Sequence, residues 1–198
     1  MRRRLVEIAE DLLVAEGPQG VTAEEVARRA DVSLQTVYNR IGGKQALLLA
    51  IAERAMEENR RYIDLAYDVQ GTVEERGRAV FLAYVKFAFE RPQPFRILAN
   101  PPEEPAAMAR IAAMAAEQNA RQAAIIREGI AEGSVNPSLD PEATAHAIWS
   151  MLNGLLLLAL RDDGLRPASI TPESLVQTAM TMMEFGLRRR QCESPRNF

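Results

Sequence analysis

The sequence is poor in the residues that most often carry out catalysis or bind metals. Among its 198 residues there is one histidine, His146, and one cysteine, Cys192. A lone cysteine cannot form an intrachain disulfide, which fits a protein of the cytoplasm. The sequence has no His-Glu-x-x-His motif, no Gly-x-Ser-x-Gly elbow and no phosphate-binding glycine loop. We therefore expect no metal site, no cofactor and no enzymatic activity.

A long uninterrupted apolar run is also lacking. The most hydrophobic stretch, 148–160, is interrupted by Ser150 and Asn153 and is too short to cross a bilayer. The arginines near the N-terminus precede Glu7 and Glu10 rather than an apolar segment, which argues against a signal peptide. We expect a cytoplasmic protein that does not associate with membranes.

Neither sign of charge dominates the sequence. The net charge is −3, and residues 1–48 hold equal numbers of basic and acidic side chains. Binding to phosphates depends on how cations are arranged on a surface more than on their total. The charge balance therefore permits a nucleic-acid partner without requiring one.

The spacing of apolar residues predicts an all-α protein of about nine helices. Leu5, Ile8, Leu12 and their neighbours form one apolar stripe of helical period, and no segment has the alternation of a strand. Pro92 and Pro94 interrupt the chain. Helices are expected over about 5–16, 22–30, 33–41, 44–67, 72–91, 105–133, 140–161 and 171–190.

Several helix starts have specific capping signals. Thr22–Glu25 and Thr72–Glu75 each have the form of a capping box, in which the threonine hydroxyl accepts from the backbone of the glutamate and the carboxylate reaches back. Asp140 and Thr171 each precede a proline at the first helical position. Ser33 is expected to cap the third helix.

Two short helices joined by the turn 31–33 form a helix-turn-helix pattern. In such a unit the second helix enters the major groove of DNA. Val37 and Ile41, four residues apart, are expected to face the core of this unit together with Val32. The open side of the helix then carries Gln35, Thr36, Asn39 and Arg40.

The residues of this segment suit contact with a DNA duplex. Glutamine and asparagine amides pair with adenine edges, and a leucine can meet a thymine methyl group. Hydroxyls and a lysine at a helix start suit phosphates. The candidate DNA-binding residues are Thr22, Ser33, Leu34, Gln35, Thr36, Tyr38, Asn39 and Lys44. Thr22 and Ser33 are helix caps in any case. For Leu34 and Tyr38 packing is the alternative role, and for Gln35 and Asn39 it is a solvated face.

Segment 21–48 closely resembles the helix-turn-helix of the tetracycline-repressor (TetR) family. The matching residues are Thr22, Ala27, Ala30, Val32, Ser33, Thr36, Tyr38, Lys44 and Leu47. Asp31 replaces the glycine usual in the turn, and aspartate tolerates a left-handed backbone better than most residues. The resemblance implies a DNA-binding domain over 1–47 and a ligand-binding, dimerisation domain over 48–198. It also implies a homodimeric repressor that binds a palindromic operator and is released by a small molecule.

Two apolar helices near the C-terminus suggest the dimer contact. Segment 147–160 is apolar on nearly every side, so it needs cover from two directions. The final helix adds a second apolar stripe between Leu175 and Leu187. The family resemblance implies that these two helices form a four-helix interface across a two-fold axis.

Aromatic and methionine residues are the candidates for a ligand pocket that would suit a hydrophobic small molecule. They are Phe81, Tyr84, Phe95, Met108, Met114, Trp149 and, as a polar member, Asn153. The alternative for each is ordinary core packing, because apolar side chains at helical spacing usually pack. For the whole chain, the alternative function is a helical protein-interaction module without DNA binding, which leaves the polar face at Gln35–Asn39 and Lys44 unexplained.

Overall fold

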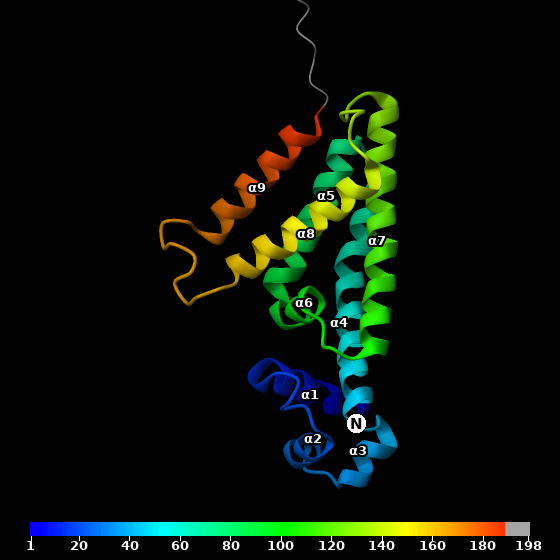
Figure 1. Ribbon diagram of the computed structural model, residues 1–198, viewed down its shortest axis with the longest axis vertical. Coiled ribbons are helices and arrows are strands. Elements are labelled where there is room, and N and C mark those ends of the chain that lie inside the picture. The colour runs from blue at the N-terminus through cyan, green and yellow to red at the C-terminus, as the bar shows by residue number, and fades with distance from the viewer. Residues whose placement is uncertain (189–198) are drawn as a thin grey trace, which may run out of the picture. The chain divides into compact units, whose positions relative to one another are not determined.

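The computed structural model describes residues 1–188, and all of its regular elements in that range are α-helices (Figure 1). The nine helices of this range are α1 (Arg2–Glu16), α2 (Ala23–Ala30), α3 (Leu34–Arg40), α4 (Lys44–Tyr67), α5 (Val73–Glu90), α6 (Pro92–Ala99), α7 (Pro105–Glu132), α8 (Pro141–Ala159) and α9 (Pro172–Leu187). The all-α prediction is confirmed. None of the described helices has the length and apolar character needed to span a membrane.

The predicted starts of α8 and α9 are confirmed. Asp140 caps α8 by accepting a hydrogen bond from the backbone of Ala143 at 2.7 Å, and Pro141 occupies the first turn. Thr171 caps α9 in the same way, accepting from the backbone of Ser174 at 3.1 Å. A proline there costs no hydrogen bond, because the first helical N–H groups have no partner within the helix.

The two capping boxes differ from each other. At α5, Thr72 accepts from the backbone of Glu75 while the Glu75 carboxylate accepts from the backbone of Thr72, so both halves form. At α2 the Thr22 hydroxyl accepts from the backbone of Glu25 at 3.1 Å, but the carboxylate does not reach back. It accepts from Arg28 and Arg29 instead. The predicted second half of the α2 box is therefore wrong, because two guanidinium groups attract a carboxylate more strongly than one amide does.

Helix α6 lies where the sequence indicated only an interruption. Pro92 and Pro94 stand in its first turn, where their missing N–H groups leave no bond unmade. Phe95, Ile97 and Leu98 then face inward and are buried. The prolines end α5 and also allow a new helix to begin.

The described chain divides into two compact units. The N-terminal unit comprises residues 1–64 and 86–116, and the C-terminal unit comprises residues 65–85 and the described residues from 117 onward. The predicted domain limit after residue 47 stays a prediction. Cys192 and the predicted end of the last helix at residue 190 lie outside the described residues.

The N-terminal unit has a core that joins α1, α2, α3 and the start of α4. Its fully buried members include Leu5, Leu12, Val21, Val26, Val37, Leu47 and Ile51. A second group is aromatic: the Phe87 ring lies 5.6 Å from the Tyr62 ring and 6.4 Å from the Phe95 ring. Tilted and edge-on ring pairs at such distances are favourable.

The core of the C-terminal unit is mainly aliphatic. Its buried cluster consists of Val73, Ala123, Ile125, Ile126, Val135 and Ala145. Gly129 of α7 is essential to this packing, because a Cβ atom there would lie 2.5 Å from Val135 Cγ2 and 2.9 Å from Val73 Cγ1. Helices α8 and α9 pack against each other in this unit.

Candidate nucleic-acid interface and ligand cavity

The turn between α2 and α3 has a left-handed residue at its first position. Asp31 has φ 53° and ψ 54°, and its backbone N–H closes the end of α2. The expected tolerance of aspartate for this conformation is confirmed. Ser33 then caps α3, with its hydroxyl accepting from the backbone of Thr36 at 3.2 Å. These two residues set the direction in which α3 leaves the turn.

Helix α3 presents one buried and one open side. Val37 is fully buried and Ile41 is half-buried, as the spacing predicted. Gln35 and Asn39 are exposed, and Tyr38 is 48% exposed. Leu34, for which packing was an equal alternative, is 39% exposed. The side of α3 that carries the candidate DNA-binding residues is therefore accessible to solvent.

The polar candidates on this side are already arranged by hydrogen bonds. Gln35 Nε2 donates to Asn39 Oδ1 at 2.8 Å, and the Ser33 and Thr36 hydroxyls lie 2.8 Å apart. Lys44 Nζ donates to Gln19 Oε1 at 3.2 Å, which fixes the ammonium group beside the α1–α2 loop. Six of the eight candidates thus lie on α3 or at its cap, Lys44 begins α4, and Thr22 caps α2.

The cations near this surface fall into two groups. Arg28 and Arg29 bind Glu25, and Arg29 also binds Glu16 at 2.6 Å. The two guanidinium groups lower the pKa of Glu25 to about 2. Arg40 is exposed at the end of α3 and forms no ion pair within the described chain.

Sequence reasoning placed Arg40 on the open side of α3 but did not count it among the binding residues. Its position one turn after Thr36 was the available signal. Gln19 was missed altogether, because it contacts Lys44 across 25 residues of sequence and no local pattern marks it.

A cluster of ion pairs joins α1 to α4 within the N-terminal unit. Arg54 of α4 contacts Glu7 at 2.9 Å, Glu10 at 3.1 Å and Glu58 at 3.3 Å. Glu58 and Glu10 are buried, and burial raises the pKa of Glu10 while Arg54 opposes that rise. Arg91, the N-cap residue of α6, binds Glu58 at 2.6 Å. Helices α1, α4 and α6 are therefore tied to one another by a shared, largely buried set of charges.

The seven candidate ligand residues lie in different places. Phe95 and Met114 are buried in the N-terminal unit, and Met108 of the same unit is 44% exposed. Tyr84, Trp149 and Asn153 come together in the C-terminal unit. The Tyr84 hydroxyl donates to Asn153 Oδ1 at 2.7 Å and also interacts with the Trp149 side chain. Burial raises the pKa of Tyr84, so this hydroxyl stays neutral.

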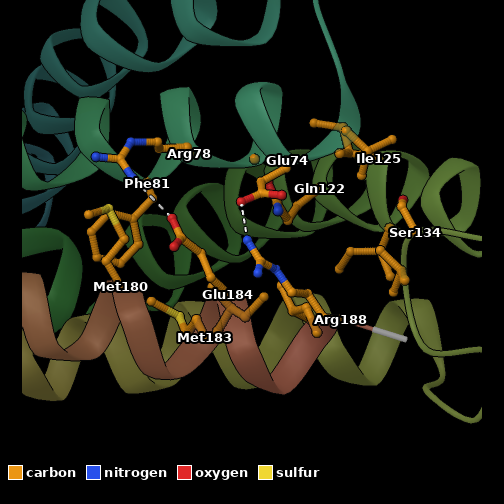
Figure 2. A pocket seen from close by; sticks show the side chains of 16 residues that line it. Glu74, Arg78, Phe81, Gln122, Ile125, Ser134, Met180, Met183, Glu184 and Arg188 are labelled. Carbon is orange, nitrogen blue, oxygen red and sulfur yellow. Dashed lines mark hydrogen bonds and ion pairs between the residues drawn. The ribbon is translucent and has the colours of Figure 1, made fainter. Parts of the chain in front are cut away.

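Phe81 lines a cavity that the other six candidates do not reach. The cavity has a volume of about 110 Å³ and lies in the C-terminal unit (Figure 2). Its walls come from α5, α7, α8, α9 and the loop after α7, and its apolar lining includes Val73, Phe81, Ile125, Ile126, Val135, Ile148, Met180, Met183 and Leu187. Sequence reasoning missed most of this wall, because it required knowing how α9 lies along α5.

A larger apolar groove of about 700 Å³ runs along α8 and α9. It is lined by residues such as Met151, Leu155, Leu175 and Met182. Met182 and the nearby Phe185 are each 69% exposed. Large apolar side chains gathered on one exposed face usually mark a protein interface.

Two family models match the chain. The family model described as "Bacterial regulatory proteins, tetR family" matches residues 5–51. A second model, "Tetracyclin repressor-like, C-terminal domain", matches residues 78–183, which is more than half of the chain. The chain belongs to the TetR family. It is a TetR-family transcription regulator whose α2–α3 segment is the family's helix-turn-helix.

Solved structures agree with the fold of this TetR-family regulator. A regulatory protein of the tetR family from Rhodococcus RHA1 has a TM-score of 0.78 at 21% identity, with 96% of this chain and 98% of that chain covered. The ketosteroid transcriptional regulator KstR2 of Mycobacterium tuberculosis has a TM-score of 0.72 at 16% identity, covering 96% and 95%. AibR, solved in complex with isovaleryl coenzyme A and operator DNA, has a TM-score of 0.76 at 19% identity, covering 94% and 98%. No curated protein sequence matches the chain.

Proposed function

We propose that this TetR-family regulator is a homodimeric repressor that binds a palindromic operator through α3 and is released by a small hydrophobic molecule. The observation that carries the proposal is the two-sided character of α3. Val37 is fully buried while Gln35, Tyr38 and Asn39 face solvent. A seven-residue helix with one buried anchor and an exposed amide pair is suited to entering a major groove.

The candidate residues have two kinds of role in this proposal. Gln35 and Asn39 read base edges, since their amides can donate and accept together. Tyr38, Thr36 and Lys44 contact phosphates and set the register on the duplex. Ser33 and Thr22 hold the helix starts and add phosphate contacts, and Leu34 meets a thymine methyl.

The homodimer is proposed to form through α8 and α9. The groove along these helices and the exposed Met182 and Phe185 give an apolar surface that a second copy can cover. A two-fold dimer presents two α3 helices to two half-sites, which is why the operator is expected to be a palindrome. Sedimentation at micromolar concentration tests this step, and a stable monomer there contradicts it.

The proposal extends to the effector and to the place of action. AibR was solved in complex with both isovaleryl coenzyme A and operator DNA, which supports a small-molecule effector for a DNA-binding protein of this fold. For the present chain we propose a small hydrophobic effector and no enzymatic activity. Its place of action is the cytoplasm, where a bacterial regulator meets its operator.

Selection of binding sites from random duplex DNA tests the function directly. Enrichment of a palindrome supports the repressor, and the absence of enrichment at low salt supports a protein-interaction module instead. Asn39→Ala is expected to relax base preference at one position of each half-site. The matched control is Gln70→Ala, which removes an amide side chain from an exposed position of the C-terminal unit.

Phosphate contacts have a different signature. Lys44→Ala is expected to weaken binding to all sequences and to lower the salt dependence by about one counterion. Lys86→Ala, which removes an exposed lysine from α5, is the control. An Asn39→Ala variant that loses affinity equally for every base, as Lys44→Ala should, contradicts the reading role of Asn39.

A further inference from the structure

The cavity of Figure 2 has a polar group that no protein atom satisfies. Gln122 of α7 lines the cavity, and its Oε1 atom is buried without a hydrogen-bond partner in the described structure. A buried amide left unpaired costs stability, so such groups in folded proteins usually meet a water or a ligand. Phe81, Ile125 and Ile126 of the wall offer no polar side-chain atom, and the hydroxyl of Ser134, which also lines the cavity, already contacts Gly129 O at 3.3 Å and Glu132 Oε1 at 2.9 Å. The place available for a partner of Gln122 is the cavity itself.

Two ion pairs between α5 and the C-terminal end of α9 lie at the rim of the cavity. Arg78 Nη1 lies 3.1 Å from Glu184 Oε1, and Arg188 Nη2 lies 2.9 Å from Glu74 Oε1 (Figure 2). All four side chains are at least partly exposed. Exposed pairs of this kind contribute little to stability, so the rim can open and close at small cost. Since the two pairs carry no net charge, the rim favours neither an anionic nor a cationic ligand.

Three side chains separate the cavity from the apolar groove of α8 and α9. Ile148, Met183 and Leu187 line both spaces. A molecule that pushes on these residues from the cavity side therefore alters the surface that a second copy would cover. Methionine walls such as Met180 and Met183 adapt their shape readily, because the side chain is unbranched and flexible.

We propose that this cavity binds a compact, neutral, apolar molecule with one hydroxyl group, of about the size of phenol, and that binding alters dimerisation through Ile148, Met183 and Leu187. The effect on dimerisation rests on the proposed function, whereas the binding of the molecule does not. The volume is comparable to that of apolar protein cavities of about 150 Å³ that bind benzene. A hydroxyl fits Gln122 because it can donate to the amide oxygen or accept from the amide nitrogen.

Phenol and benzene test the chemical part. Calorimetric titration of the full-length chain is expected to give tighter binding of phenol than of benzene. In Gln122→Met, which keeps the length and removes the polar atoms, the preference for phenol over benzene should fall by about tenfold while benzene still binds. An unchanged preference, or no binding of either compound to the folded wild-type chain, overturns the assignment.

Gly77 provides a second test that does not touch Gln122. It lines the cavity, and a Cβ atom built on it meets no other atom within 4 Å, so a side chain can begin there without a clash. Gly77→Leu should abolish binding of both compounds by filling the space. Gly77→Ala is the matched control, because it changes the helix backbone in the same way and leaves most of the volume. Equal phenol binding by the Ala and Leu variants, with thermal unfolding showing both folded, overturns the location.

The regulatory part is measured by sedimentation with and without saturating phenol. A change in the dimer dissociation constant of at least about fivefold is expected, absent in Gly77→Leu. Phenol binding with no change in dimerisation overturns the coupling. Operator selection is measured separately, without phenol. If the chain selects an operator but binds no phenol, the cavity assignment is overturned and the proposed function stands. If the chain binds phenol but selects no operator, the proposed function is refuted and the cavity assignment stands.

Discussion

The two units of the molecule use charge in opposite ways. In the N-terminal unit, Arg54 binds three carboxylates, two of them buried, and Arg91 adds a second cation to Glu58. In the C-terminal unit the ion pairs at the cavity rim are exposed, and the buried polar atom of Gln122 is unpaired. When one member of a buried charge network moves away, the remaining charges are left uncompensated at a high cost in free energy. Such a network therefore resists rearrangement. We therefore expect the charge cluster of the N-terminal unit to keep its geometry and the cavity rim of the C-terminal unit to rearrange easily.

The largest expected effect is the loss of Arg54. Arg54→Met leaves the buried carboxylates of Glu10 and Glu58 without their shared cation and should lower the free energy of unfolding by about 3 kcal/mol. Urea denaturation measures it. The control is Arg61→Met, whose partner Glu57 is as exposed as Arg61 itself, and which should change stability by less than about 1 kcal/mol. Similar losses in both variants would contradict the rigid character of the N-terminal cluster.

Two helical glycines of the C-terminal unit should respond in opposite directions. Gly129→Ala forces a Cβ atom against Val135 and Val73 and should destabilise the unit by about 1–3 kcal/mol. Gly77→Ala places the same atom in open space and should stabilise α5 by about 0.5–1 kcal/mol. Thermal unfolding of the pair measures the difference. A stabilising Gly129→Ala would mean that the aliphatic core is less closely packed than the distances indicate.

The rim of the cavity should be tolerant of charge removal. Arg78→Met breaks the contact with Glu184 and should cost less than about 1 kcal/mol, because both side chains reach water. The cost should disappear in about 1 M salt, where exposed charges are screened. A loss as large as that of Arg54→Met would show that the rim is as rigid as the N-terminal cluster.

The smallest expected effect is the pH dependence contributed by Glu25. Its pKa is lowered from 4.5 to about 2 by Arg28 and Arg29. The stabilisation is therefore fully present above pH 4.5 and is lost as the pH falls towards 2. The difference in melting temperature between wild type and Glu25→Gln should be greatest near neutral pH and shrink through this range. Glu24→Gln, at an exposed neighbouring position, is the control, and a difference that does not depend on pH contradicts the assignment.

The opposite sign is expected at Glu10. Burial raises its pKa above 4.5, so its contribution to stability is present below pH 4.5 and is lost as the pH rises through the raised value. The two glutamates thus titrate in opposite senses within one unit.

The sequence predicted the features that depend on local chemistry. The helix starts at Asp140 and Thr171, the left-handed Asp31 and the inward Val37 follow from a cap, a turn and a spacing, each within a few residues. Helix α6 was missed because Pro92 and Pro94 are compatible both with a break and with a first turn. At α2, competition from Arg28 and Arg29 for Glu25 could not be judged from the capping pattern alone.

The cavity could be predicted only in part for a different reason. The sequence marked Phe81, Phe95 and Met114 as residues of a pocket or of the core, but it does not tell to which compact unit each of them belongs. Phe81 lines the cavity, whereas Phe95 and Met114 are buried in the other unit. The α9 wall and the unpaired Gln122 depend on contacts between segments far apart in sequence, for which a single chain gives no local signal.

The hydrogen bond between Gln35 and Asn39 has a consequence for discrimination between sequences. The two amides are closed on each other in the free protein, so any duplex they read must first replace a neutral, exposed bond that contributes about 0.5–1.5 kcal/mol. A base pair that offers both a donor and an acceptor offsets that loss, and one that offers neither does not. Under the proposed function, the cost of breaking the amide pair is the same at every site and is recovered only at sites whose bases pair with both amides, which favours matched sites without any repulsive contact.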